Sequence, residues 1–95
     1  MAGPFASGKK TVSSAGTAEA IIATGTHARS ITIIAIAANS GQVHLGDSGV
    51  SASTNTGLDA GERLEITDLN GFDIGTIFID VGTNDDGVDF YYVAS

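Results

Sequence analysis

The chain has 95 residues, enough for one small domain, and its lack of cysteine excludes disulfides and thiolate metal sites. Its formal net charge is −7, and its four basic residues are too dispersed to form the basic patch that nucleic-acid binding requires. No apolar run approaches the roughly 18 residues of a membrane span, and the start of the chain lacks the apolar segment of a signal peptide, so we expect neither nucleic acid nor a membrane as a partner.

Thirteen glycines, a single proline and many serine and threonine residues, without sustained helical periodicity, predict short strands joined by turns. We therefore expect an all-β fold, a small antiparallel β-sandwich or jelly-roll-like barrel of about seven strands. Residues 1–14 are predicted to form an N-terminal arm and edge strand, and residues 15–95 a single β-sandwich domain.

The first eight residues are small and rich in Gly and Ala, and they cannot bury their own surface. Residues 9–14 read as the first edge strand, with two lysines that discourage edge-to-edge aggregation. We expect this arm to bind a partner through Pro4, Phe5, Lys9 and Lys10. Phe5 is its only large apolar group, and the lysines of an otherwise acidic protein can pair with acidic groups on the partner.

Residues 19–24 read as a second strand, although the pattern leaves a helical turn open. Residues 30–38 predict a central strand with apolar side chains on both faces, because Ile31, Ile33, Ala35 and Ala37 alternate with Ile34, Ile36 and Ala38. One face can line a small core. The other needs a cover that so short a chain can hardly supply, so we expect a homo-oligomer, namely a trimer.

Residues 42–46 alternate and predict a hairpin partner for the central strand, with Val43 and Leu45 inward and His44 outward. Residues 47–56 form a polar connection longer than most hairpin loops, and long loops are often functional. This connection is the second and weaker candidate contact surface, through Ser48, Val50, Ser51 and Asn55.

Residues 63–67 predict an antiparallel strand with one solvent-exposed face and with Leu64 and Ile66 buried on the other. Residues 68–75 read as a turn-rich corner whose Leu69, Phe72 and Ile74 enter the core. Residues 76–81 predict the next strand, and residues 84–87 have the turn chemistry to close a hairpin to a last strand at 88–93. In that strand the alternation places Val88, Phe90 and Tyr92 inward and Tyr91 outward.

The middle of the chain resembles a pattern found in small structural proteins of tailed-phage virions. In that pattern a strand ending in Gly-Asp, here within 43–51, precedes a Ser/Asn-rich loop and a Leu-x-x-Gly-Glu turn, here within 57–66. Strands ending in Ile-x-Ile-Asp and in an aromatic pair follow, here within 69–80 and at Tyr91 and Tyr92. The resemblance covers residues 24–93.

This resemblance implies a small β-sandwich on the outside of a virion, a head decoration or cement protein that binds the major capsid protein and stabilises its contacts. Such proteins commonly stand as trimers on the head surface, and the chain would reside in the host cytoplasm during assembly. The alternative from a different class is a receptor- or glycan-binding domain of a phage tail or an adhesin, for which exposed aromatic residues are the discriminating feature.

Candidate chemistry is sparse along the sequence. Asn84, Asp85, Asp86 and Asp89 offer oxygen ligands but lack the alternating spacing of a calcium loop, and a hairpin tip explains them better. His27 and His44 are the only histidines, and no nucleophile motif accompanies them. We therefore expect a protein that is not an enzyme, with no catalytic residue, no metal site and no cofactor.

Overall fold

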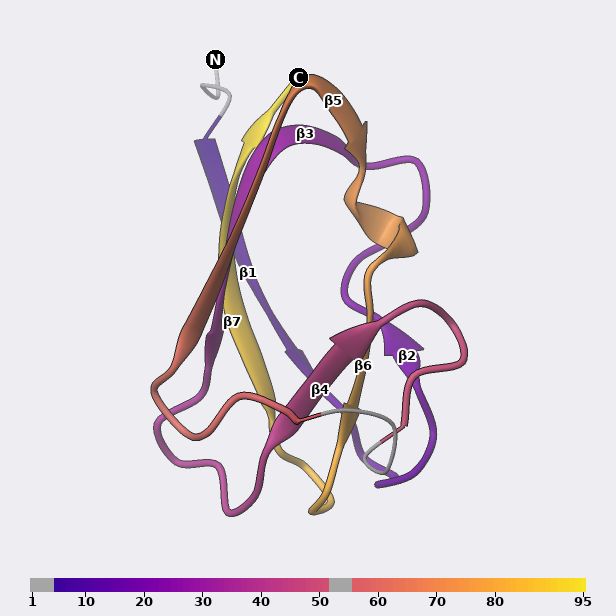
Figure 1. The fold of residues 1–95 in the computed structure, drawn as a ribbon, viewed down its shortest axis with the longest axis vertical. Helices are drawn as coiled ribbons and strands as arrows, with labels where there is room; N and C mark the ends of the chain where they lie inside the picture. The colour runs from indigo at the N-terminus through magenta and orange to yellow at the C-terminus, as the bar shows by residue number, and fades with distance from the viewer. Residues whose placement is uncertain (1–4, 52–55) are drawn as a thin grey trace.

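A computed structural model describes residues 5–51 and 56–95 (Figure 1). Its strands are β1 (Phe5–Thr11), β2 (Glu19–Ala20), β3 (His27–Ala35), β4 (Val43–Gly46), β5 (Arg63–Asp73), β6 (Phe78–Val81) and β7 (Gly87–Ala94), with a 3-10 turn η1 (Ile74–Thr76) before β6. They form a four-stranded sheet in the order β1-β7-β3-β5 and a three-stranded sheet in the order β2-β6-β4. All pairings are antiparallel. The predicted all-β sandwich is confirmed.

Consecutive strands lie in different sheets throughout the described chain, so the chain crosses the sandwich at every connection. Two hairpin predictions are therefore wrong. Strand β4 pairs with β6 rather than with β3, and the turn at 82–86 joins β6 of one sheet to β7 of the other (Figure 1). The predicted turn at residues 84–87 is present, and Asp85 adopts a positive φ of 71° there.

The core lies between the two sheets and follows from the alternation of side chains along each strand. Inward residues of the larger sheet meet inward residues of the smaller one, and the fully buried side chains include Ile31, Ile33, Val88, Val43, Ile79 and Val81. Val12 and Ile74, just outside the strands, complete this core. Phe90 is buried and Tyr92 partly buried, as predicted.

Strand β5 departs from its predicted burial. Leu64 is 40% exposed and Leu69 is 86% exposed, so neither enters the core as expected. The reason is that β5 is an edge strand whose register with β3 shifts opposite Arg29, where residues 68–71 bulge away from the sheet. Beyond the bulge the chain arches over the end of the sandwich to η1 and β6 (Figure 1).

Strand β3 has neighbours on both sides, as expected for a central strand. It ends at Ala35, earlier than the predicted 38, and its outward residues Thr32 and Ile34 are half-buried. Strand β1 starts at Phe5, earlier than the predicted 9, and pairs with β7 over its whole length. Residues 5–11 are therefore part of the sheet rather than a separate arm. Among the described residues, no helix is long and apolar enough to cross a membrane.

Candidate functional site: the outer face of the four-stranded sheet

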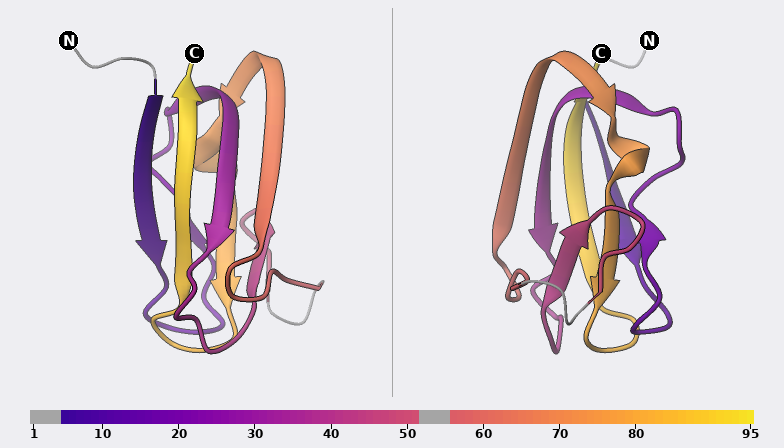
Figure 2. Two further views of the ribbon diagram at one scale, coloured as in Figure 1. Left: turned by 90° about the vertical axis from the view of Figure 1, so that its left-hand side faces the viewer. Right: turned by 45° about the vertical axis from the view of Figure 1, so that its right-hand side comes forward.

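The four-stranded sheet turns one face to the core and one away from the smaller sheet, and we call the second the outer face. Figure 2 (left) shows β1, β7, β3 and β5 side by side on this face. The register sets its rows across the sheet: Phe5, Val93, Ser30 and Thr67, then Ser7, Tyr91, Thr32 and Glu65, then Lys9, Asp89, Ile34 and Arg63. Both ends of the described chain contribute to it.

An exposed aromatic pair stands on the outer face, at β1 and β7. Phe5 is 63% exposed and Tyr91 is 43% exposed, and their ring centroids lie 6.1 Å apart with an interplanar angle of 11°. The two residues are diagonal neighbours on β1 and β7, a distance that long side chains can bridge. Large aromatic side chains left in water on a small domain commonly mark a contact surface.

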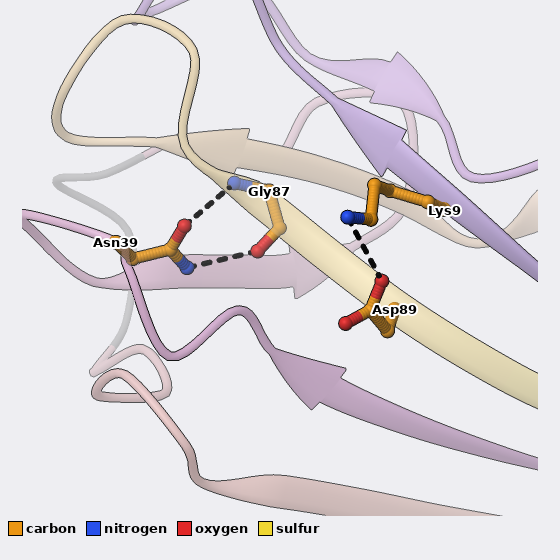
Figure 3. Close-up of polar contacts among 4 residues, drawn as sticks. All are labelled: Lys9, Asn39, Gly87 and Asp89. Carbon is orange, nitrogen blue, oxygen red and sulfur yellow. Dashed lines mark hydrogen bonds and ion pairs between the residues drawn. The ribbon is translucent and has the colours of Figure 1, made fainter.

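The lysines predicted to reach a partner both have partners within the domain. Lys9 Nζ lies 3.8 Å from Asp89 Oδ1 on the outer face (Figure 3), and Lys10 Nζ lies 2.9 Å from Glu19 Oε1. Lys10 therefore ties β1 to the first strand of the smaller sheet. The outer face keeps Lys9 and Asp89 as a solvated ion pair beside the aromatic pair, a contact worth little to stability on its own.

The predicted loop surface is only partly available. Ser48 is exposed and Ser51 half-buried, whereas Val50 is buried against Gly46. Val50 therefore anchors the loop to its own domain instead of facing a partner. Pro4 and Asn55, the remaining predicted contact residues, lie outside the described residues.

At the end of the four-stranded sheet opposite the aromatic pair, polar side chains form hydrogen bonds that stabilise the connecting loops. Both oxygens of the buried Asp86 accept the amide of Ser40, and Oδ2 also accepts that of Gly41, at 2.8 Å. Asn39 brackets Gly87 by accepting its amide at 3.0 Å and donating to its carbonyl at 2.8 Å (Figure 3). Asn84 Oδ1 accepts the amide of Ala15 at 2.8 Å. These groups fix the loops that connect the sheets.

His44 points away from the core, as predicted, but it is buried, with 5% of its surface exposed. It lies opposite the fully buried Asp80 across β4 and β6, on the face of the smaller sheet that points away from the core. Connecting segments cover this face, since the Gly16 amide donates to Asp80 Oδ1 at 2.9 Å and Gly57 closely approaches the His44 ring. In the described part of the chain, no group of three or more acidic or histidine residues could hold a metal ion.

The sequence predicts a contact role for Phe5 and an outward side chain for Tyr91, but it does not predict that the two side chains are neighbours. Alternation shows that Tyr91 faces outward, but nothing in the sequence pairs the first strand with the last. A short apolar patch shared by the two ends of a chain is a signal only once that pairing is known. Comparisons of the chain with protein-family models, with curated proteins and with solved structures find no match.

Proposed function

We propose that this protein is a virion decoration protein that binds the outer surface of a tailed-phage head and stabilises contacts between major capsid proteins. The sequence pattern of residues 24–93 supports the class of protein, and the aromatic pair supports a binding role. A small acidic domain with two exposed, adjacent rings is suited to docking on another protein, since aromatic residues are enriched at interfaces while charge keeps the free protein soluble.

The aromatic pair carries this proposal. Phe5 and Tyr91 stand on paired strands of a sheet whose other face is packed on the core, so the rings are held on a rigid support. Rigid aromatic anchors lose little conformational entropy on binding, which makes them effective contact residues. The neighbouring Lys9–Asp89 ion pair supplies a polar rim.

Binding to empty shells of the major capsid protein encoded in the same genome tests the proposal. The wild-type chain should co-sediment with the shells to saturation and raise the temperature at which they break. Phe5→Ser and Tyr91→Ser should each weaken binding by about fivefold or more, as expected for anchor residues. Leu69→Ser is the matched control, because it removes an exposed apolar side chain from the far edge of the sheet.

Shell binding that is equally strong for all four proteins, or absent for the wild type, would contradict the proposal.

The second candidate, a glycan-binding domain, is favoured by the nearly parallel orientation of the two rings, which a sugar ring could stack against. For that function, Tyr91→Ser would abolish retention on a glycan surface while the wild type would show no affinity for shells.

A further inference from the structure

The outer edge of β5 is open. Strand β5 pairs with β3 on one side, and within residues 5–51 and 56–95 no strand pairs with its other side. Its first half, residues 63–67, continues the sheet regularly, and Arg63, Glu65 and Thr67 are exposed there. An exposed edge of this kind is a template for another strand unless something blocks it. Here neither a proline nor the bulge, which starts at residue 68, interrupts residues 63–67.

At two charged residues, Arg63 and Glu65, the backbone N–H and C=O groups of β5 point away from β3. The carbonyl of Glu62 accepts the amide of Ala35 of the β3 segment at 2.8 Å. Because the direction of backbone groups alternates along a strand, Arg63 and Glu65 direct their N–H and C=O groups toward the free edge. These groups are in place to form a ladder with a further antiparallel strand.

Arg63 and Glu65 also make this edge complementary to itself. They have opposite charges, stand two residues apart and project on the same outer face. Within the part of the chain that the structure describes, neither forms an ion pair within 4.0 Å, in contrast to Lys9 and Lys10. We propose that two copies of this chain pair through antiparallel β5 strands about a two-fold axis at Leu64. Arg63 of each copy then lies directly opposite Glu65 of the other.

An apolar cleft beside Leu64 supports a second copy as the occupant. The cleft has a volume of about 240 Å³ and lies between the β4 and β5 edges of the two sheets, lined by Val43, Leu45, Thr56, Gly57, Leu58 and Leu64. The two-fold axis places the two Leu64 side chains opposite each other in the non-hydrogen-bonded position, where cross-strand side chains approach most closely. Pairing therefore removes part of the exposed Leu64 side chain, which lines this cleft, from water.

The geometry fixes the symmetry of the assembly. An interface that uses the same patch on both copies closes at two, so the structure favours a dimer through the β5 edge over the trimer that the apolar outer face of the central strand predicts from sequence. A contact of one short strand is small, and we expect a dissociation constant in roughly the micromolar range or weaker.

Sedimentation velocity over a range of concentrations tests the pairing with charge reversals. The wild type should show a monomer–dimer equilibrium. Arg63→Glu and Glu65→Arg should each weaken dimerisation by about tenfold or more, because both cross-strand pairs then join like charges. An equimolar mixture of the two variants should form a heterodimer as readily as the wild type forms its dimer, since every pair in it again joins opposite charges.

Arg29→Glu is the matched control, because it changes the net charge by the same amount as Arg63→Glu and lies outside the paired segment, in the bulged part of β3. It should leave the dissociation constant of the dimer within about twofold of the wild-type value, since solvent largely screens an exposed charge outside the paired segment. A wild type that stays monomeric at millimolar concentration, a trimer, equal weakening by Arg29→Glu, or a mixture no more associated than its components would each overturn the proposal.

Discussion

Asp73 shows how a single carboxylate organises a crossing between the sheets. Its side chain accepts the amide of Gly25 at 2.9 Å and the amide of Gly75 at 2.8 Å, which caps η1 and fixes the loop before β3. These hydrogen bonds, that from Gly25 foremost, hold the pKa of Asp73 below its ordinary value of 3.8, and the nearby His27 adds to the effect. The ionised form is therefore favoured in the folded state.

This shift predicts an acid-dependent loss of stability. A carboxylate with a lowered pKa in the folded state stabilises the protein fully above its unfolded-state pKa, and this contribution is lost as the pH falls through the folded-state pKa. The free energy of unfolding should therefore decrease below about pH 4 in the wild type. Asp73→Asn should be less stable at neutral pH and lose less stability between pH 4 and pH 2, as measured by urea unfolding at each pH.

Asp68→Asn provides the control for that measurement, because Asp68 lies on the same strand and its carboxylate accepts a nearby backbone amide, that of Asn70. Its acid dependence should follow the wild type more closely than that of Asp73→Asn. Equal slopes for Asp73→Asn and the wild type would show that the hydrogen bonds from Gly25 and Gly75 do not favour the charged form.

At the scale of elements, the meeting of β1 and β7 depends on the absence of a side chain at Gly87. A Cβ atom there would collide with the carbonyl oxygen of Lys10 and lie 2.7 Å from Thr11 Cα, both backbone atoms that cannot move aside without breaking the pairing. Gly87→Ala should therefore lower the free energy of unfolding by about 1–3 kcal/mol or more, as expected for overpacking.

Gly82→Ala is the matched control in the same connection, because a Cβ atom at Gly82 would meet nothing within 4 Å. Its stability should equal the wild type or exceed it slightly, since alanine reduces the freedom of the unfolded chain. Chemical denaturation of the two variants side by side gives the comparison. A Gly87→Ala protein as stable as Gly82→Ala would mean that β1 and β7 are less closely packed at this point.

Element positions were largely predictable from sequence, whereas their pairing was not. Alternation located β3, β6 and β7 within a few residues and identified Phe90 as inward and Tyr91 as outward, because these signals are local. The hairpins failed because a turn sequence specifies a change of direction and not which sheet receives the next strand. The aromatic pair failed for the same reason, since it depends on pairing the two ends of the chain.

Local sequence patterns also could not predict which polar residues are buried. His44 and Asp80 alternate correctly to the face away from the core, but the segments with Gly16 and Gly57 cover that face. Conversely, Leu69 has the composition of a core residue yet stands in the bulge of an edge strand. Which segments cover a face and which edges stay open are properties of the whole arrangement.

At the scale of the whole molecule, the alternation between sheets means that nearly every strand pairing joins distant parts of the chain. Phe5 pairs with Val93, so forming β1 against β7 requires almost the entire chain to close on itself. Such closures cost conformational entropy before contacts compensate for it, and they slow folding. We therefore expect refolding to take about milliseconds to seconds, as is typical of β-sandwich domains.

A circular permutant tests whether this long-range closure limits the rate. The two ends of the described chain, Phe5 and Ser95, lie at the same end of the sandwich (Figure 1), so residues 1–4 and a short glycine linker can connect Ser95 to Phe5 and make β7 and β1 consecutive strands. New ends can be placed after Ser48, which is exposed in the turn between Asp47 and Val50. Stopped-flow refolding of the permutant should be faster by up to about tenfold, because the loop that must close becomes several times shorter. Its unfolding rate should change less than its folding rate if the β1–β7 pairing forms in the transition state. An unchanged folding rate in a permutant of wild-type stability would show that another pairing, such as β3 with β5, sets the barrier.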